Sequence, residues 1–555
     1  MPHNDVNISR RHLIGGLGSA GLLTLAGTRA AHASEPESAP AQDFLVTTPA
    51  ELATALGLAQ PGDAVVLQDG TWSSINIVIA DNANHGLPGA PITLRAQTRG
   101  GVTFTGSSWI NLARDHWVID GFRFRDGYLP NGDRGVIYFG LPLTGGGHAE
   151  AHHCEITHIS IQDFNPVNPA VQYNWVRLMG TNNTVSWSHF SGKNHLLDMV
   201  AAHWRKSSPG TPTRHRFHHN YFGDIAPTTT NGFGALTPVM GRPSGVTDAE
   251  WPDLDDGIVI EDNLFHACNG ESEIISVKSS GNTVRRNTFV DCLGYVNLRQ
   301  GHRNEISSNY IFGGDLASED AYFPGGVPVG ESGGIRVSGE DHRIFNNYIQ
   351  GVHGSGIWIQ NGSSANAWYG YQPVKNLEVV HNTIVDPGRA AITIGAGISR
   401  TTAAPGVPGG GDNVVPENLT FADNILVGSG SESLIQYGRW PWGSEPTVPS
   451  TPTGLVWQAN LAQAPLVHEG SVPAGITVTD PQLVSAGYPQ PVFRPGVGSP
   501  AIDAGLGAYP YVNHDIEGRP RPKPRDIGAH EQGVGRVCNR PLTGADVGPD
   551  YLTLG

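Results

Sequence analysis

A short pattern recurs along this chain of 555 residues: alternating apolar residues, one asparagine, and a further apolar pair. Examples are RFHHNYF ending at Phe222, TVRRNTFV ending at Val290 and LEVVHNTIV ending at Val385. The shortest intervals between repeats are 24 and 22 residues, and the others are longer, as expected if loops are inserted into some coils. The aligned asparagines are Asn220, Asn263, Asn287, Asn309, Asn347, Asn382, Asn424 and Asn460. Short strands in coils of about 22 residues are typical of a parallel β-helix.

The asparagines have a physical role in such a fold. Asparagine adopts the left-handed conformation of a corner at low cost, and stacked amides can hydrogen-bond along the axis. Earlier in the chain, Gly121, Asp163 and His189 are expected at the same position. An antiparallel sandwich or propeller is the alternative, but hairpin signals between the strands are too few for it. We therefore predict an all-β fold, a right-handed parallel β-helix, with the hand following the general rule for parallel crossovers.

The ends of the solenoid need covering, because an open coil exposes an apolar cross-section. Helical periodicity is confined to Pro49 to Ala59, which we expect to cap the N-terminal end. Residues 43–464 are expected to form the β-helix, which is also the catalytic domain if the site predicted below is correct. Residues 465–555 are richer in proline and charge, and we expect them to close the other end.

Residues 1–33 have the pattern of an export signal. Arg10 and Arg11 precede an apolar stretch from Gly15 to Gly27, and small residues then surround His32. This arrangement is typical of a bacterial twin-arginine signal, and the apolar stretch is short for a membrane anchor. Residues 34–42 are expected to be a flexible leader. We expect a secreted or periplasmic product, without a membrane span once the signal is removed.

The charge and the cysteines restrict the function further. A formal net charge of −16 argues against nucleic-acid binding and requires any polyanion site to be locally cationic. The four cysteines contain no Cys-x-x-Cys pair, so a zinc or redox motif is not indicated. Cys268 and Cys292 lie at equivalent places in two repeats. A disulfide and two free buried thiols are both consistent with that spacing.

The segment from Asn269 to Asn282 (NGESEIISVKSSGN) carries the densest chemistry. Glu271 and Glu273 are two residues apart, so both leave one face of a strand. Lys278 follows at an odd offset, which puts it on the opposite face of a straight strand. A corner or a bulge between them would bring all three to one face. Arg299 follows Lys278 by 21 residues, about one coil, and is expected to lie beside it.

ESEIISVKSSGN followed by NLRQG resembles the active-site segment of polysaccharide lyase family 6, which contains chondroitinase B and many alginate lyases. The resemblance implies a β-helix with Lys278 and Arg299 as catalytic residues. It implies a Ca²⁺ site formed by Asn231, Glu271 and Glu273. Family members often have histidine where this chain has Gln300, which leaves the choice of substrate open. Weaker candidates for substrate binding are Lys193, His195, Tyr295, Gln300, His302 and Arg336.

These residue types suit β-elimination from a uronate polymer. The C5 proton is weakly acidic, and a hard cation held by carboxylate and amide oxygens would neutralise the sugar carboxylate. Lys278 would act as the base once its ammonium has lost a proton, and Arg299 would stabilise the developing charge or assist the departing oxygen as the acid. The expected products carry 4,5-unsaturated uronate ends.

We therefore predict a monomeric, Ca²⁺-dependent alginate lyase of the poly(mannuronate) type. Three alternatives remain. One is a lyase of dermatan or chondroitin sulfate, and another is a glycoside hydrolase that uses Glu271 and Glu273. The third is a non-catalytic β-helix that binds glycans. The preference between mannuronate and guluronate, and the choice between internal and terminal cleavage, stay open.

Overall fold

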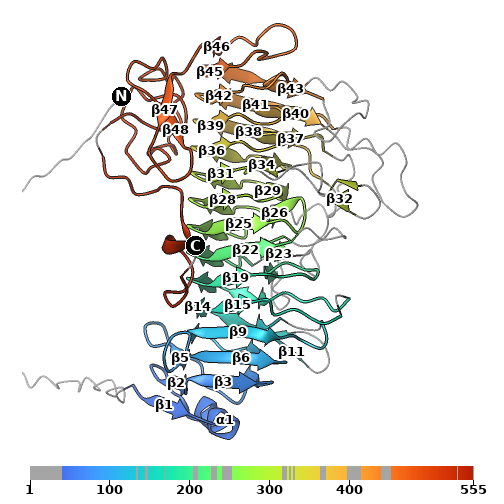
Figure 1. Ribbon diagram of the computed structural model, residues 1–555, viewed down its shortest axis with the longest axis vertical. Coiled ribbons are helices and arrows are strands. Elements are labelled where there is room, and N and C mark those ends of the chain that lie inside the picture. The colour runs from blue at the N-terminus through green and yellow to red at the C-terminus, as the bar shows by residue number, and fades with distance from the viewer. Residues whose placement is uncertain are drawn as a thin grey trace, which may run out of the picture. The chain divides into compact units, whose positions relative to one another are not determined.

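Three long parallel sheets form the protein, and successive coils of the chain contribute a strand to each (Figure 1). The computed structural model describes residues 41–132, 135–143, 148–168, 170–203, 211–226, 234–240, 253–314, 322–323, 327–328, 332–362, 371–396, 414–438, 452–533 and 535–553. We name the sheets A, B and C. Sheet A has 14 strands from β1 (Asp43–Val46) to β44 (Val456–Gln458), and sheet B has 14 from β3 (Gly70–Ser73) to β46 (Ile476–Val478). This arrangement confirms the predicted parallel β-helix.

Sheet C has 12 strands and carries most of the candidate site residues. In order along the sheet its strands are β4 (Asn76–Ile79), β7 (Trp109–Leu112), β10 (Ile137–Phe139), β16 (Val176–Leu178), β20 (Val200–His203), β23 (Leu236–Met240), β26 (Glu273–Lys278), β29 (Gly294–Gln300), β34 (Ser332–Val337), β37 (Ile357–Gln360), β40 (Ile392–Ala396) and β43 (Ile435–Tyr437).

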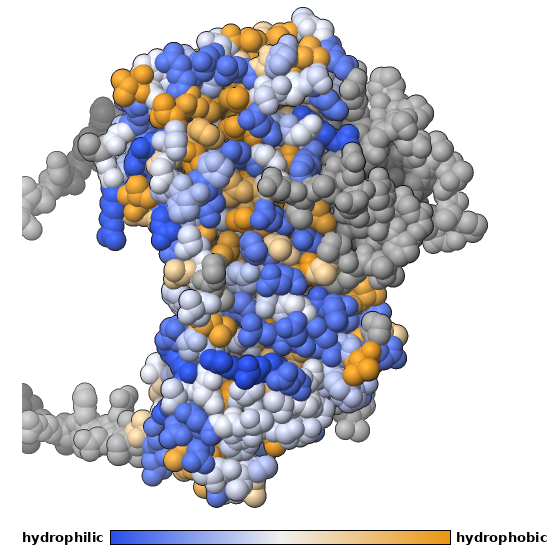
Figure 2. Space-filling model, viewed as in Figure 1, coloured by the Kyte–Doolittle hydropathy of each residue, from blue (hydrophilic) through white to orange (hydrophobic). Residues whose placement is uncertain are grey.

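The core lies inside the coils, where apolar side chains from all three sheets meet. Strands such as β5 (Ile92–Ala96) alternate fully buried with half-buried residues, as the period of two requires. The intervening residues point outward. On the face seen in Figure 2, hydrophilic residues accordingly interleave with apolar ones across the coils.

The predicted N-terminal helix is present as α1 (Pro49–Leu58), which contacts β1 and β2 (Ala64–Leu67). Thr48 and Glu51 form a capping box, which satisfies backbone N–H groups at the start of the helix. Leu52, Ala55 and Leu56 are buried. The helix therefore covers the apolar interior at the first coils.

The eight asparagines form one continuous hydrogen-bonded ladder. From Asn263 onward, each side-chain oxygen accepts from the backbone N–H and from the amide of the asparagine one coil earlier. The amide-to-oxygen distances run from 2.9 to 3.1 Å between Asn220 and Asn460. Each Nδ2 also reaches backbone carbonyls, as Asn287 does to Ile260 and Arg285. The ladder therefore satisfies polar groups that the closed coils would otherwise bury unpaired.

Two details of the predicted corner were wrong. The left-handed residue is the one before each ladder asparagine, with φ between 50° and 56°, at positions as different as Asp262, Arg286 and Ala459. The asparagine is needed for its amide rather than for its backbone. In the early coils the ladder position also lies elsewhere than expected. Ser188 rather than His189 donates its backbone N–H to Asn220, since His189 pairs with Tyr221 one position further on.

The same strand register corrects the two other early positions. Phe122 and Ile159 take the ladder position in their coils, rather than Gly121 and Asp163. Both are apolar and fully buried. An apolar side chain cannot donate or accept a hydrogen bond, so the asparagine ladder does not continue through Phe122 and Ile159.

A second, shorter ladder at another corner was not predicted. Ile258 donates its backbone N–H to Asn282, and Asn282 donates its own to Asn304. Asn304 in turn donates to the imidazole of His342. Asparagine and histidine both serve here as the side chain that accepts a backbone N–H from the preceding coil. Because the residue type varies, this repeat is not recognisable in the sequence.

The four cysteines are free. Cys268 and Cys292 lie on adjacent coils, and the backbone N–H of Cys268 points at the Cys292 sulfur at 3.4 Å. Both are buried, so of the two possibilities left open by the spacing the structure shows the pair of buried thiols.

The C-terminal segment ends the β-helix and also packs along its earlier coils. After β46 the chain forms a hairpin, β47 (Leu483–Ser485) and β48 (Phe493–Pro495), and then runs back beside earlier coils (Figure 1). Leu542 contacts Thr288, and Tyr551 reaches the carbonyls of Phe122 and His158. Among the described residues, no helix is long and apolar enough to cross a membrane.

The asparagine ladder should contribute strongly to stability. Asn287→Ala removes the acceptor of both the backbone N–H and the amide of Asn263, which are buried. We expect the free energy of unfolding to fall by roughly 2–4 kcal/mol, the cost of leaving these groups unpaired. Asn513→Ala, at an exposed position, is the matched control and should change it by less than about 0.5 kcal/mol. Denaturant titration measures both, and equal effects would contradict this role of the ladder.

Candidate active site

Two opposite β-bulges between β26 and β29 shape the candidate site. Glu273 pairs with Tyr295 but Ile275 pairs with Val296, so Ile274 is an extra residue in β26. Further along, Val277 pairs with Leu298 and Lys278 with Gln300, so Arg299 is an extra residue in β29. Ile275, Val277, Val296 and Leu298 belong to the core. Bulges redirect the side chains beside them, so Glu273, Lys278 and Arg299 can share the outer face, as the sequence suggested.

Glu273 and Arg299 form an ion pair at the centre of the site. Glu273 is 3% exposed and accepts hydrogen bonds from the Arg299 guanidinium and the Ser276 hydroxyl. Burial alone would raise the pKa of Glu273. Arg299, Lys278 and Arg336 outweigh burial and lower that pKa to about 2. The attraction of Glu273 raises the pKa of Arg299, so both groups are charged.

Glu271 lies in a crowded acidic environment. Burial raises the pKa of Glu271 well above its ordinary value, and the carboxylates of Glu273 and Asp198 raise it further. A bound cation would relieve this repulsion, and carboxylate oxygens are the donors that Ca²⁺ prefers. The donor set present therefore fits the predicted metal, with Glu271 and Glu273 as ligands.

The third predicted ligand, Asn231, lies outside the described residues. Within the part of the chain that the structure describes, no three His, Cys, Asp or Glu side chains group closely enough to hold a metal by themselves. A site built on Glu271 and Glu273 therefore needs further oxygen donors. The predicted amide ligand, Asn231, would be one of them.

Lys278 differs from the other cations of the site. It is half-buried at the end of β26 and close enough to Glu271 and Glu273 to influence both. Among the residues described, its ammonium has no hydrogen bond and no ion pair within 4.0 Å. Arg299, in contrast, is tied to Glu273. The site thus holds one fixed cation and one amine whose nitrogen is available.

An outward row of side chains crosses the strands beside this centre. Cross-strand register places Ser276, Asn297, Arg336 and Trp358 next to one another on β26, β29, β34 and β37. Arg336 lies over the rings of Trp358 at 4.3 Å and Tyr371 at 4.7 Å, and its Nε donates to Gln360. Arg299 also lies over Tyr371, at 5.2 Å.

Polar atoms in this row lack partners. Both amide atoms of Asn297 and the Nη2 of Arg336 are buried without a hydrogen bond within the described residues. Such groups are costly unless something binds them, which is what a polar ligand on this face would do. Sequence reasoning missed Asn297, although it is part of the NLRQG segment, and also missed Asp198, Trp358 and Tyr371.

The weaker substrate candidates are placed in different ways. Lys193 is fully buried, and its ammonium donates to the backbone carbonyls of His195 and Leu196. His195 is 2% exposed and lies near Asn165 and the carbonyl of Tyr173. Both brace a loop, so their placement does not support contact with a substrate.

Three further candidates follow on β29 and the turn after it. Tyr295 is fully buried, and its hydroxyl accepts from Ser355. The ring of His302 accepts a backbone N–H from Glu340 at the next corner, away from the outward row. Gln300 is in register with Lys278 and is 3% exposed. Arg336 and Gln300 are thus the weaker candidates that lie beside the centre.

Gly294 fixes the turn that presents the two glutamates. Its φ is +93°, and a Cβ there would lie 2.5 Å from the carbonyl carbon of Ser272 and 2.8 Å from the backbone carbonyl oxygen of Glu271. Only glycine accepts both the backbone conformation and this approach. The start of β29 therefore packs directly under the Glu271 turn.

Comparisons with known proteins identify the family of this chain. The family profile described as Chondroitinase B matches residues 46–436, more than half of the chain. The solved structure of the polysaccharide lyase family 6 alginate lyase AlyGC is 26% identical, with a TM-score of 0.68, over 92% of this chain. This chain covers 59% of the AlyGC chain.

Two further structures are similar. The family 6 polysaccharide lyase Pedsa3628 from Pseudopedobacter saltans is 25% identical with a TM-score of 0.63, over 92% of this chain and 100% of its own. A mannuronic acid specific family 6 lyase from human gut microbiota is 24% identical with a TM-score of 0.60, over 76% of this chain and 86% of its own. A search of curated protein sequences finds no match. With the profile match and these neighbours, the chain belongs to the Chondroitinase B family, polysaccharide lyase family 6.

Proposed function

We propose that this protein cleaves alginate by β-elimination, with Lys278 as base, Arg299 as charge stabiliser and Ca²⁺ held by Glu271, Glu273 and Asn231. The observation that carries the proposal is the contrast between the two cations. Arg299 is fixed on Glu273, whereas the Lys278 amine has no partner among the described residues. A guanidinium cannot lose its proton in a protein, but an amine can. The division into base and stabiliser follows from that difference.

The reaction needs a proton removed from C5 and an oxygen expelled from C4. Lys278, as the neutral amine, takes the C5 proton, and the electrons of the C–H bond form the C4–C5 double bond as the bond from C4 to oxygen breaks. The departing oxygen takes up a proton from solvent. Arg299 donates hydrogen bonds to the charge that develops on the sugar carboxylate. When bound, Ca²⁺ would neutralise that carboxylate and so make the C5 proton more acidic.

The outward row on sheet C is the part of the structure that we propose binds the polymer beside the centre. Asn297 and Arg336 have buried polar atoms without partners among the described residues, and Trp358 and Tyr371 hold the Arg336 guanidinium against their rings. Alginate is favoured because two of the similar structures are described as an alginate lyase and as a mannuronic acid specific lyase. Dermatan and chondroitin sulfate are the alternative substrates within the same family. Export through residues 1–33 and action as a monomer are part of the proposal.

One assay tests the reaction and the substrate together. The protein is incubated with alginate, dermatan sulfate or pectate, and ultraviolet absorbance is followed. Elimination creates a conjugated unsaturated uronate that absorbs, whereas hydrolysis by Glu271 and Glu273 or simple binding does not. We expect absorbance to rise with alginate. Cleavage without a rise would contradict elimination, and a rise with dermatan sulfate alone would contradict the substrate.

Removal of Ca²⁺ should stop turnover before it affects folding. Glu273, one of the proposed ligands, lies on β26 of sheet C outside the core, whereas the coils are held by the core and the asparagine ladder. We expect a chelator to abolish the absorbance change and added Ca²⁺ to restore it, with a nearly constant melting temperature. Circular dichroism during heating provides the second measurement. Unfolding on chelation would show that the ion is structural.

A further inference from the structure

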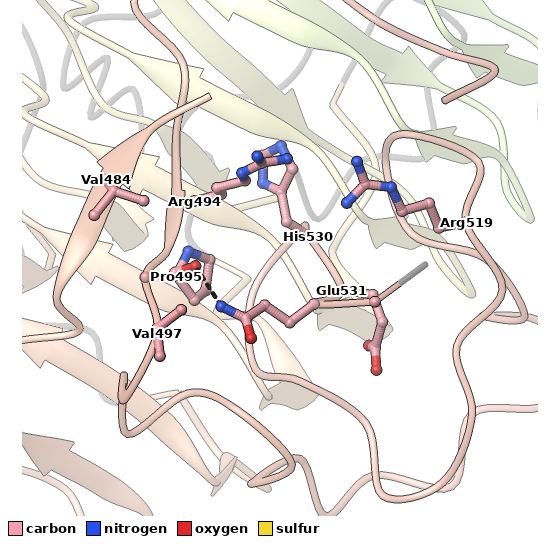
Figure 3. Close-up of a pocket in the computed structure, with 10 residues that line it drawn as sticks. Val484, Arg494, Pro495, Val497, Arg519, His530 and Glu531 are labelled. Atoms are coloured by element: carbon pink, nitrogen blue, oxygen red, sulfur yellow. Dashed lines mark hydrogen bonds between the residues drawn. The ribbon is translucent and has the colours of Figure 1, made fainter. Parts of the chain in front are cut away.

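A pocket lies in the C-terminal segment, against a different face of the β-helix from the outward row of sheet C. The hairpin β47–β48 and residues 519–533 enclose about 400 Å³. The lining residues are Val484, Arg494, Pro495, Gly496, Val497, Arg519, His530, Glu531, Gln532 and Gly533 (Figure 3). A pocket of this size holds a sugar ring and is larger than an inorganic anion requires.

The wall behind the pocket is rigid. Val492, Ile516 and Ala529 pack with Tyr310 and Tyr348 of sheet B in one buried cluster. The Tyr348 hydroxyl accepts the backbone N–H of Phe493 at 3.0 Å. The pocket is therefore part of the folded body and is held to sheet B.

Two arginines bring spare donors to this pocket. Arg519 pairs with buried Glu517 at 2.9 Å through one terminal nitrogen, while its Nε is buried without a partner in the described chain. Arg494 reaches Glu517 only at 3.6 Å, longer than a hydrogen bond. One carboxylate is thus shared by two guanidinium groups. Their remaining N–H groups suit a second carboxylate, which arginine binds in a two-pronged manner.

His530 brings two unpaired ring nitrogens to the pocket. It is 1% exposed, and both of its ring nitrogens are buried without a hydrogen bond within the described residues. Burial, and then the nearby charges of Arg494, Arg521 and Arg519, lower the pKa of His530 to about 3. The ring is therefore neutral, with one donor and one acceptor nitrogen, and both require a partner.

Glu531 does not cancel the positive charge of the pocket. Its carboxylate accepts from Arg521 at 2.9 Å and from the backbone N–H of Asp526 at 3.0 Å. Figure 3 shows this carboxylate directed away from His530 and from the two guanidinium groups that line the pocket. Arginine and imidazole nitrogens therefore dominate the polar lining.

We propose that this pocket is a non-catalytic binding site for a carboxylated sugar unit, with the sugar carboxylate on Arg494 and Arg519 and a hydroxyl or ring oxygen on His530. Val484, Pro495 and Val497 supply apolar contacts for the ring, which a bare anion would not use. The choice of a uronate rests on the proposed function, since alginate would present the same unit to both sites. Such a site would hold the enzyme on its polymer between cleavage events.

The test uses the full-length protein and D-mannuronate, which has the carboxylate but no glycosidic bond to cleave. Hydrogen–deuterium exchange is measured over residues 484–497 and 519–533, with mannose and sodium sulfate as separate arms. We expect mannuronate to slow exchange there and mannose to have no effect. Arg494→Gln should weaken the binding by about tenfold or more, the loss expected for hydrogen bonds to a charged group.

A second variant guards against a folding defect. Val497 is 94% exposed, so Val497→Asp places a negative charge at the pocket wall without disturbing the core. It should also weaken mannuronate binding, at an unchanged melting temperature. Absence of protection by saturating mannuronate would overturn the site, and equal protection by sulfate would overturn its assignment to a sugar. This readout does not depend on elimination, so failure of the ultraviolet assay would leave it standing.

Discussion

Lys278→Ala should lower kcat for alginate elimination by about 10²- to 10⁴-fold, the usual contribution of a general base. The amine is half-buried and makes no hydrogen bond or ion pair in the described part of the chain, so its loss removes no structural contact. The melting temperature should therefore stay the same. Initial rates of ultraviolet absorbance at saturating alginate measure the effect.

Two comparisons make this result specific. Lys278→Arg should be nearly as inactive as the alanine variant, because a guanidinium keeps its charge but cannot accept the C5 proton. Lys375→Ala is the matched control. Lys375 is a half-buried cation on sheet A, paired with Glu417 at 3.2 Å, and its loss should not change the rate. Near-normal turnover in Lys278→Arg would show that the amine is a fixed charge and not the base.

The asparagine repeat was sufficient to predict the coils from Asn220 onward, because the ladder needs one amide per coil and few residues replace it. Before Asn220 the same position holds Ser188, Ile159 and Phe122, which do not look alike in sequence. The frame there follows from strand register alone. The left-handed corner was assigned to the wrong residue for a similar reason, since Asp262, Arg286 and Ala459 all adopt that conformation.

The candidate site, too, could be predicted from the sequence only in part. Glu273, Lys278 and Arg299 share one motif, and the odd offset between Glu273 and Lys278 already required an irregular strand. The bulges at Ile274 and Arg299 supply it. Trp358 and Tyr371 could not be found this way. They reach Arg336 from later parts of the chain, one through strand pairing and one from the segment beyond β37, with no fixed spacing to the motif.

Arg299→Ala should lower kcat by about 10²- to 10³-fold, the effect of removing one donor that stabilises developing charge. It should also destabilise the fold, unlike Lys278→Ala. The Arg299 side chain is 30% exposed but pairs with the buried Glu273, so the variant leaves a buried carboxylate without the cation that is paired with it. We expect the free energy of unfolding to fall by roughly 1–3 kcal/mol, below the range for fully buried pairs because Arg299 is partly solvated.

Arg216→Ala separates these two effects. Arg216 binds Glu261, a carboxylate that is 3% exposed, at 2.6 Å on sheet A and away from the outward row. Arg285 and Arg286 also contact Glu261, so this variant should lose less stability than Arg299→Ala and keep its full rate. Arg299→Lys completes the comparison, because it keeps the charge but not the guanidinium group that donates to Glu273. If rate followed stability alone across the three variants, Arg299 would only support the fold. A loss of rate in both Arg299 variants, with Arg216→Ala fully active, places the guanidinium in the reaction.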